Sequence, residues 1–247
     1  MPVDKTMVQG QPGTPLSKLK TQRSHNLLVL SNPLTGQEQN FLSWYSGVYL
    51  EALLASENVL QVQHYDPHEV DITRGAHAPL PYRYLSIIEL SIDGAQAAEA
   101  LIHSIQALHN TEASAQNVAT WLYYPISEQV GCSSTLSDSM LTLAFANPVS
   151  GCEDEFREWY STRHIRHALN IPALISGQCF ELTQYQHTGS GDALYKVVAI
   201  YEQEGTPEDI IASFSSLPPG TFDFPSMHNK AFAEWVYRPL TISTEVR

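Results

Sequence analysis

The chain has 247 residues, of which 43% are hydrophobic and 16% are charged, a composition typical of folded globular proteins rather than of disordered or fibrous ones. It carries 26 acidic residues against 13 lysines and arginines, for a formal charge of −13. Because this charge repels nucleic-acid phosphates and anionic lipid surfaces, we expect neither a nucleic acid nor a membrane as partner.

The cysteines and the N-terminal segment indicate where the protein works. Cys132, Cys152 and Cys179 form no C-x-x-C pair, which argues against a disulfide framework and a cysteine zinc site. No apolar stretch approaches 18 residues, and the N-terminal segment lacks the apolar run of a secretory signal. We therefore expect a cytoplasmic protein in which residues 1–24 form a mobile leader.

The two halves of the chain resemble each other. Residues 32–46 (NPLTGQEQNFLSWYS) align without gaps on residues 147–161 (NPVSGCEDEFREWYS), with eight identities in fifteen positions. Two further segments repeat in the same order, namely 82–89 on 195–202 and 118–125 on 232–239. Such regular internal similarity indicates a tandem duplication.

Each half predicts the same six elements. In the first half we expect strands and helices, in chain order, at 27–31 (strand), 38–55 (helix), 59–65 (strand), 82–89 (strand), 95–109 (helix) and 118–125 (strand). In the second half they are expected at 141–146, 153–170, 175–182, 195–202, 207–217 and 232–239, with Thr206 as the N-cap before Pro207. The order β-α-β-β-α-β is that of the ferredoxin-like unit.

A ferredoxin-like unit covers one face of its sheet with helices and leaves the other face bare, so two units can bury their bare faces together. We therefore predict an α+β fold in which two fused ferredoxin-like repeats form one intramolecular barrel. The first repeat is expected at residues 25–127 and the second at 139–247, joined by a polar connection.

The pattern N-P-x-x-G-x-E-x-x-F-x-x-W-Y, followed in the second half by Arg163 and His164, resembles the dimeric α+β barrel superfamily, and within it EthD-type proteins. The resemblance implies a ligand cavity between a sheet and its own helices, with a histidine as acid or base. It does not select a reaction, because this superfamily includes cofactor-free isomerases, cyclases, dehydratases and monooxygenases as well as haem enzymes.

Two histidines continue the predicted buried face of the second-half helix. With a period of 3.6 residues, His164 and His167 fall on one stripe with four preceding residues, Phe156, Trp159, Tyr160 and Arg163. Apolar surroundings would keep an imidazole neutral, and a pKa near neutrality suits proton transfer in both directions. We therefore predict His164 and His167 as catalytic residues. The alternative is that His164 is a core histidine bonded to a carbonyl and His167 stabilises the helix end.

The first half carries Tyr49 and Ala52 at the positions of these histidines. We therefore interpret the second half as active and the first as supporting. The other histidines, His64 and His109 among them, form no recognised metal motif and are weaker catalytic candidates, with His64 favoured among them because it lies on a predicted strand. Six residues are candidate substrate contacts, namely Tyr49, Asn147, Trp159, Tyr160, Trp235 and Tyr237. Trp235 and Tyr237 share a strand face, Trp159 and Tyr160 pack the core or wall the cavity, and Asn147 fixes its turn or holds a substrate oxygen.

No dinucleotide, P-loop or nucleophile-elbow motif is present, nor is the metal motif H-E-x-x-H. We therefore predict a lyase or isomerase of the dehydratase or cyclase kind that needs no cofactor and no metal. Its substrate would be a small, mostly apolar carbonyl or phenolic compound, and the protein a monomer or homodimer. Two alternatives stay open: a haem-binding or cofactor-free oxygenase, and a non-catalytic, ligand-binding stress-response protein.

Overall fold

The computed structural model describes residues 23–73, 81–112, 114–132, 139–186, 195–218, 220–240 and 244–245. Most of the expected leader (residues 1–22) and part of the expected connection (133–138) lie outside the described residues. Among the described residues, no helix combines the length and the apolar character needed to cross a membrane.

Both halves contain the predicted elements in the predicted order. The first half comprises β1 (His25–Pro33), α1 (Glu38–Trp44), η1 (Tyr45–Tyr49), α2 (Leu50–Leu54), β2 (Val59–Pro67), β3 (Tyr84–Leu90), α3 (Ala95–Thr111) and β4 (Ala115–Pro125). The second half comprises β6 (Met140–Pro148), α4 (Glu153–Trp159), η2 (Tyr160–His164), α5 (Ile165–Ala168), β7 (Leu174–Leu182), β8 (Val197–Gln203), α6 (Pro207–Ser215) and β9 (Met227–Pro239). Two short strands, β5 (Val130–Gly131) and β10 (Thr244–Glu245), pair with β7 and β2. The expected connection thus contains a strand that was not predicted.

The predicted N-cap of α6 is confirmed. The Thr206 hydroxyl accepts a hydrogen bond from the Asp209 backbone N–H, and the Asp209 carboxylate accepts one from the Thr206 backbone N–H. This capping box satisfies backbone groups that the first turn of a helix leaves without partners.

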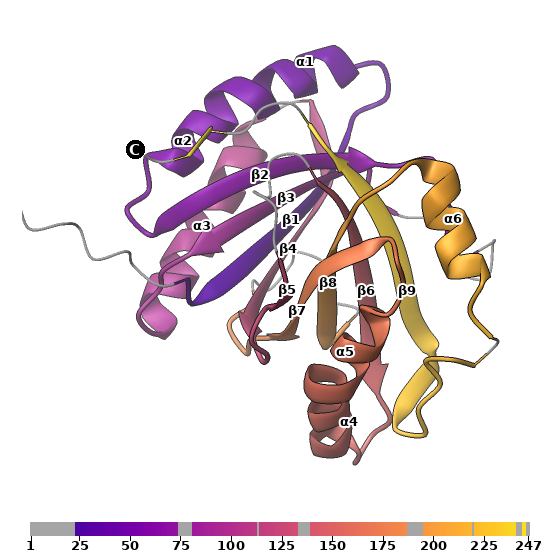
Figure 1. Ribbon diagram of the computed structural model, residues 1–247. Helices are drawn as coiled ribbons and strands as arrows, with labels where there is room; N and C mark the ends of the chain where they lie inside the picture. Colours follow the sequence, from indigo (N-terminus) through magenta and orange to yellow (C-terminus); the bar gives the residue numbers. More distant parts are fainter. Residues whose placement is uncertain are drawn as a thin grey trace, which may run out of the picture.

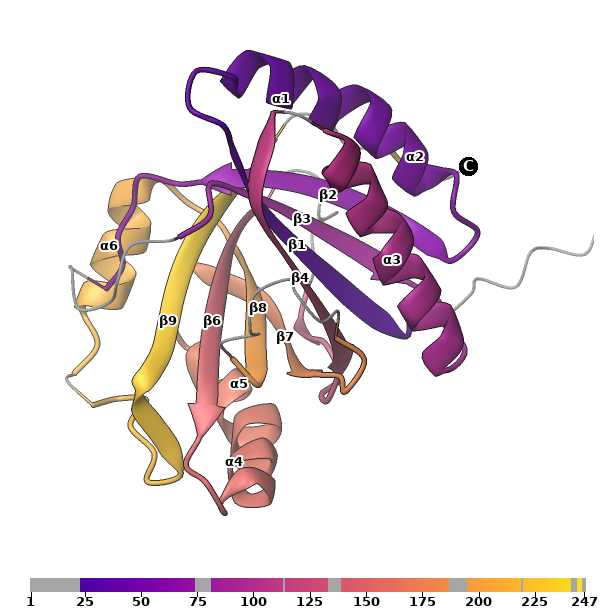
Figure 2. The same ribbon diagram turned by 180° about the vertical axis from the view of Figure 1, so that it is seen from behind.

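Two antiparallel sheets, ordered β4-β1-β3-β2 and β9-β6-β8-β7, join at both edges into a closed barrel of eight strands. β4 pairs with β7 at one seam and β2 pairs with β9 at the other. The second seam is reinforced by the Arg238 guanidinium, whose Nε and Nη2 each lie 2.9 Å from the Asp66 carboxylate. The helices of both halves lie outside the barrel (Figures 1 and 2). The predicted α+β fold is confirmed.

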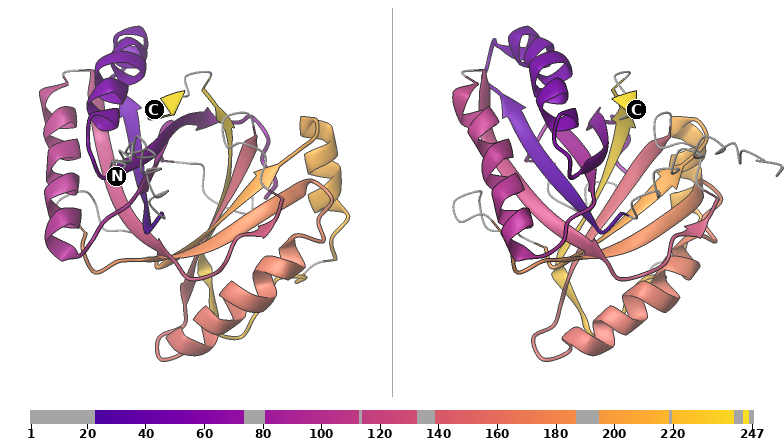
Figure 3. Two further views of the ribbon diagram at one scale, coloured as in Figure 1. Left: turned by 60° about the vertical axis from the view of Figure 1, so that its left-hand side comes forward. Right: turned by 90° about the vertical axis from the view of Figure 1, so that its left-hand side faces the viewer.

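The fold has three apolar layers. One lies inside the barrel, and the others lie between each sheet and the helices that flank it (Figure 3). We call the space enclosed by the strands the barrel interior, and it holds large side chains from both halves, such as Trp121, Phe145 and Trp235. The first outer layer lies between the first sheet and its helices, and includes Phe41 and Tyr49. The second outer layer, with Phe156 and Tyr160, is its counterpart in the second half.

The first helix of each half differs from the prediction in one respect, because a π-helical turn interrupts it. A π turn holds more residues than an α turn, and the buried stripe shifts by one position after it. The buried positions match between the halves: Phe41, Tyr45, Tyr49, Leu50 and Leu53 in one, and Phe156, Tyr160, His164, Ile165 and Ala168 in the other. His164 is therefore buried, whereas Arg163 and His167 are exposed, contrary to the predicted stripe.

Candidate second-half site

The structure distributes the predicted site residues over three separate layers. Trp159, Tyr160 and His164 belong to the second outer layer. Trp235 and Tyr237 lie in the barrel interior, which is the opposite face of the same sheet. Tyr49 belongs to the first outer layer. The predicted residues therefore do not converge on one cavity.

Aromatic rings surround His164, of which only 4% is exposed. Its ring stacks on the Tyr160 ring at a centroid distance of 4.7 Å and an interplanar angle of 8°. The rings of Trp159 and Phe222 lie 4.9 Å and 5.2 Å away. Nδ1 of His164 is buried and has no hydrogen-bond partner, so the alternative of a core histidine bonded to a carbonyl through this atom is not what the structure shows.

Burial lowers the pKa of His164 to about 3, and the nearby charge of His167 acts in the same direction. The imidazole is thus neutral at neutral pH, as expected. A base of such low pKa holds a proton poorly, so His164 is better suited to form hydrogen bonds than to remove a proton by itself.

Tyr160 and Trp159 are fixed by their own contacts. The Tyr160 hydroxyl donates a 2.7 Å hydrogen bond to the Ala144 carbonyl on β6. Trp159 stacks on Phe224 at 4.3 Å with nearly parallel rings. Both residues therefore pack the core directly against the His164 ring.

Glu234 is an ionisable group of this layer that the sequence analysis missed. It lies on β9 between Ala233 and Trp235, which face the barrel interior, so its own side chain faces the helices. Burial raises the pKa of Glu234 to about 7. The alternation of the strand could have revealed it, because the matching residue in the first half is the uncharged Thr120.

Two phenol groups lie within range of the Glu234 charge. Burial raises the pKa of Tyr160 and of Tyr201, and the charges of Cys179 and Glu234 raise both further. The Tyr201 hydroxyl, on β8, is buried and has no hydrogen-bond partner. The second outer layer thus contains a carboxyl group that titrates near neutrality, a neutral imidazole and a phenol that can donate a hydrogen bond.

Cys179 completes the layer without adding reactivity. Its thiol donates to the Tyr160 carbonyl oxygen at 3.4 Å. Burial raises the pKa of this thiol far above its usual value, which suppresses the thiolate.

Asn147 and its first-half counterpart Asn32 make equivalent hydrogen bonds. The Asn147 side-chain oxygen accepts a 2.6 Å hydrogen bond from the Lys196 backbone N–H, as that of its counterpart Asn32 does from Arg83. Both asparagines thus tie the end of the first strand to the start of the third, a long-range contact that differs from the local turn contact expected from the sequence.

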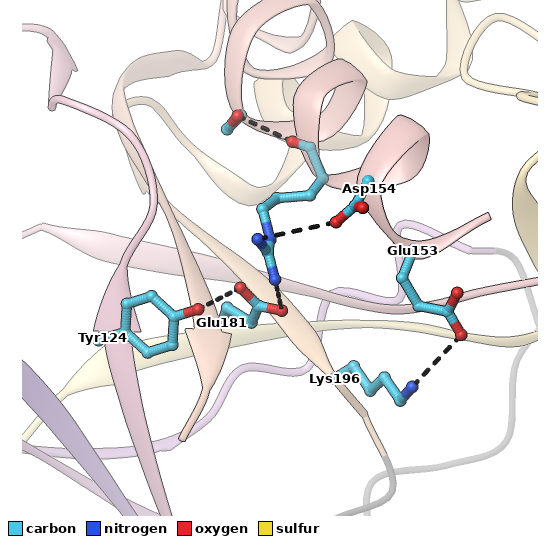
Figure 4. A network of polar contacts seen from close by, with 7 residues as sticks. Tyr124, Glu153, Asp154, Glu181 and Lys196 are labelled. Carbon is cyan, nitrogen blue, oxygen red and sulfur yellow. Dashed lines mark hydrogen bonds and ion pairs between the residues drawn. The ribbon is translucent and has the colours of Figure 1, made fainter. Parts of the chain in front are cut away.

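Figure 4 shows how ion pairs fasten α4 to the sheet. The Arg157 guanidinium lies 2.7 Å from the Glu181 carboxylate on β7, which also accepts a hydrogen bond from the Tyr124 hydroxyl on β4. Lys196 Nζ lies 3.8 Å from Glu153. These contacts position the helix that carries His164.

Within the described ranges, the remaining predicted residues do not contact the His164 ring. The exposed His167 ring lies 5.3 Å from the Phe222 ring. Trp235 packs 5.0 Å from Phe145, and its Nε1 and the Tyr237 hydroxyl are buried without partners. Trp235 and Tyr237 share one face, as predicted, but it is the face turned away from the helices.

No group of three or more histidine, cysteine, aspartate or glutamate side chains that could hold a metal ion occurs in the part of the chain that the structure describes.

No protein-family model and no curated protein sequence matches the chain. Solved structures do match. An anthrone oxidase-like protein aligns with a TM-score of 0.62 at 10% identity, over 92% of this chain and 95% of that one. A putative monooxygenase from Lactobacillus acidophilus gives 0.53 at 7% identity, over 91% and 97%. A putative chlorite dismutase gives 0.52 at 12% identity, over 89% and 96%.

These similarities confirm the fold expected from the sequence motif, that of the dimeric α+β barrels, here formed within one chain. At identities of 7 to 12% they show the fold alone.

Proposed function

We propose that the chain is an enzyme that moves a proton on a small, mostly apolar carbonyl or phenolic compound, and that the reaction takes place in the second outer layer. One observation carries the proposal: Glu234 faces the helices from β9, and its charge acts on Tyr160, whose ring stacks on the buried His164 imidazole. Burial raises the pKa of this carboxyl group to about 7. General bases work best when their pKa lies near the working pH, because they are then both available and strong enough.

In this proposal Glu234 is the base and His164 the hydrogen-bond donor. The Glu234 carboxylate takes a proton from the carbon next to a carbonyl group, and the electron pair moves to the carbonyl oxygen. The N–H of neutral His164 and the unpartnered Tyr201 hydroxyl then stabilise that oxygen. Protonated Glu234 returns the proton at another atom, or a leaving group departs, which gives isomerase or lyase chemistry.

The other predicted residues take supporting parts in this proposal. Trp159 and Tyr160 wall the substrate, His167 lies at the rim, and Asn147 ties the first strand of its half to the third. Trp235, Tyr237 and Tyr49 lie in other layers and act only through the packing of the sheet. Cytoplasmic location and a monomeric or homodimeric state stay predictions from the sequence.

Deuterium exchange tests the proposal without knowledge of the natural substrate. The probe is 2-tetralone in heavy water, and NMR follows loss of the proton signals next to its carbonyl group. We expect the protein to accelerate exchange, and Glu234→Gln to reduce the acceleration by a factor of about 100 or more, the usual range for a general base. The control, Val48→Ala, changes an exposed residue of the other half and should exchange like wild type.

The pH dependence identifies the base. If Glu234 removes the proton, the exchange rate rises with pH and levels off above about pH 7. If His164 removes it, the rate stays constant down to about pH 4, because its pKa is about 3. Wild-type exchange in Glu234→Gln, or no acceleration by the wild-type protein, would contradict the proposal.

A second candidate is a cofactor-free oxygenase, which the aromatic walls around His164 favour because they suit a flat, polycyclic phenol or ketone. One of the similar folds is titled anthrone oxidase-like, and anthrone is a useful probe. Removal of a proton from its CH₂ group gives an anion that reacts with O₂ to form anthraquinone and water. Oxygen uptake with anthrone that is lost in Glu234→Gln would favour this candidate.

Haem, the other form of this alternative, finds no support in the contacts of His164. The rings of Trp159, Tyr160 and Phe222 lie 4.7 to 5.2 Å from the imidazole, and a porphyrin ligated by His164 would have to displace at least one of them. If the protein instead binds 2-tetralone and anthrone without converting either, the ligand-binding alternative gains support.

A further inference from the structure

Five polar or ionisable side chains meet in the first outer layer, which the sequence analysis treated as supporting. They come from η1, β2, β3 and α3, and each is fully or nearly buried: Tyr45, Tyr49, His64, Ser86 and His109. We refer to them as the first-half cluster. A cluster of five polar side chains inside an apolar core requires a physical explanation.

Three members form a chain of hydrogen bonds. The Ser86 hydroxyl oxygen lies 2.6 Å from the Tyr45 hydroxyl and 2.9 Å from His64 Nδ1. Ser86 has one proton to donate. When it donates to His64, the Nε2 of that ring carries the proton; when it donates to Tyr45, Nδ1 carries the proton and Nε2 is an acceptor. His64 Nε2 can therefore present either a donor or an acceptor.

His109 presents an acceptor only. Its Nδ1 lies 3.1 Å from the Ile105 carbonyl oxygen, which can only accept, so Nδ1 carries the proton. Burial lowers the pKa of this ring to about 4 and that of His64 to about 3, where the charge of His109 adds to the effect. Both rings are thus neutral, and Nε2 of His109 carries a free lone pair.

Three buried polar atoms of the cluster have no partner at ordinary hydrogen-bond geometry: the Tyr49 hydroxyl, which lies near Ser86, and His64 Nε2 and His109 Nε2. Their rings are in contact, because Tyr49 lies 4.6 Å from His109 and 5.9 Å from His64 between centroids. A buried polar atom without a partner costs about 1 to 3 kcal/mol of stability. The cluster therefore lowers the stability of the fold unless another molecule supplies the missing hydrogen bonds.

The second half shows that the fold does not need this cluster. Strand register places Cys179 opposite Ala199 in the second half, as His64 lies opposite Ser86 in the first. The Tyr160 hydroxyl, which matches that of Tyr45, donates to a backbone carbonyl instead. The same architecture thus packs with small, less polar residues at two of these positions.

A cavity of about 340 Å³ adjoins the cluster at the end of α3 and the start of β4. His109 lines it and is 5% exposed, while the far side of the His109 ring contacts Tyr49 and Trp44. The other walls include the polar side chains of Gln106 and Gln116. A volume of this size is enough for a compound of one or two rings.

We propose that the first-half cluster and its cavity form a second ligand site, for a small neutral aromatic compound that carries a hydroxyl group. The ligand hydroxyl donates to His109 Nε2 and accepts from the Tyr49 hydroxyl, and its ring packs against Trp44 and Tyr49. Of the side chains named for these contacts, His109 alone lines the cavity, so binding turns the His109 ring aside and brings the ligand to Tyr49 and Trp44, which pack against that ring. This site lies in the other outer layer from Glu234 and does not depend on the proposed function.

Calorimetric titration of the full chain with 2-naphthol tests the proposal. We expect Tyr49→Phe and His109→Phe to raise the Kd about tenfold or more, because each removes one hydrogen bond to the ligand in a buried site. The matched control, His164→Gln, alters the other outer layer and should leave this Kd unchanged. No binding by the wild-type protein at about 1 mM 2-naphthol would overturn the proposal.

The same variants separate this site from the second outer layer. A Kd that changes in His164→Gln but stays within twofold of wild type in Tyr49→Phe places the ligand beside Glu234 and overturns the second site. A Kd that changes in Tyr49→Phe and His109→Phe alone supports it, whatever the deuterium exchange experiment shows.

Thermal unfolding distinguishes a ligand-binding role of the Tyr49 hydroxyl from a role in packing. Tyr49→Phe removes a hydroxyl that has no partner at ordinary hydrogen-bond geometry, so we expect the unliganded variant to be at least as stable as wild type while it binds 2-naphthol more weakly. A loss of stability in Tyr49→Phe would mean that the hydroxyl serves packing, and would overturn the proposal.

Discussion

Burial shifts the two central ionisable groups of the second outer layer in opposite directions. It raises the pKa of the Glu234 carboxyl to about 7 and lowers that of the His164 imidazole to about 3, because burial disfavours the charged form of each group. At neutral pH the carboxyl group, and not the imidazole, exchanges protons readily.

Two tyrosines of this layer test the hydrogen-bond assignments at the level of single residues. Tyr160→Phe removes a 2.7 Å hydrogen bond to Ala144, whereas Tyr201→Phe removes a hydroxyl without a partner. We expect Tyr160→Phe to reduce the free energy of unfolding by about 1 kcal/mol, and Tyr201→Phe to leave it unchanged or raise it. Urea unfolding measures both, and the reverse order would contradict the assigned contacts.

The sequence could predict part of this site. The helical repeat correctly indicated that His164 is buried, and strand alternation would have placed Glu234 on the helix-facing side. The strength of burial could not be predicted, because Phe222 and Phe224, which cover His164 and Trp159, lie after α6 in a segment without a counterpart in the aligned repeats.

At the level of elements, one pair of facing residues on β7 and β8 differs in size from its counterpart in the first half: one residue is smaller and the other is larger. Gly177 pairs with Tyr201 in the second half, where the first half pairs Val62 with Ile88. A Cβ atom on Gly177 would lie 2.6 Å from the Tyr201 ring and 3.3 Å from the Ile165 side chain. The glycine therefore provides the space that the Tyr201 ring occupies beneath α5.

We expect Gly177→Val to destabilise the fold by about 1 to 3 kcal/mol, the usual effect of overpacking a core. Adding Tyr201→Ile should restore much of this loss, because the pair then matches the first half. A double-mutant cycle by urea unfolding measures the coupling. Additive effects of the two substitutions would show that the residues do not share this space.

The π-helical turns are the feature of the helices that hydrophobic spacing did not predict. Hydrophobic spacing predicted one continuous helix in each half, and it correctly placed Phe156, Tyr160 and His164 inside. It could not register the extra residue of the π turn, so His167 was assigned to the buried face and is in fact exposed.

The buried groups of both halves together set the pH stability of the whole molecule. His64, His109 and His164 have lowered pKa values of about 3, 4 and 3, so between those values and 6.5 the unfolded chain binds more protons. Glu234, with its pKa raised to about 7, acts in the opposite sense between 4.5 and 7. Stability should therefore rise with pH across the acid range.

Near pH 5 the three histidines and the one glutamate give a net uptake of about two protons on unfolding, or at most roughly 2.7 kcal/mol per pH unit. We expect the urea midpoint to rise from pH 4.5 to 6.5 and to level off by about pH 7.5, where proton uptake by the histidines and proton release by Glu234 nearly cancel. Glu234→Gln should make the rise steeper. A midpoint independent of pH from 4.5 to 6.5 would contradict the burial of neutral histidines.

The duplication made the overall fold predictable, because paired segments in the two halves fixed the order of elements and the need to cover two bare sheet faces. The duplication could not predict features that occur in one half alone. α3 has 17 residues and α6 has nine, and only the longer helix carries a histidine back to Tyr49. The buried contact between His109 and Tyr49 could therefore not be predicted from the repeat.

The most direct test of the second-half site is the titration of the Glu234 carboxyl group, which requires no substrate. Carbon-13 NMR of protein labelled at its glutamate carboxyl carbons follows each group with pH, and the signal absent from Glu234→Gln identifies the residue. We predict a midpoint near pH 7 for this signal. A midpoint below about pH 5, close to that of an ordinary exposed glutamate, would contradict the proposed base.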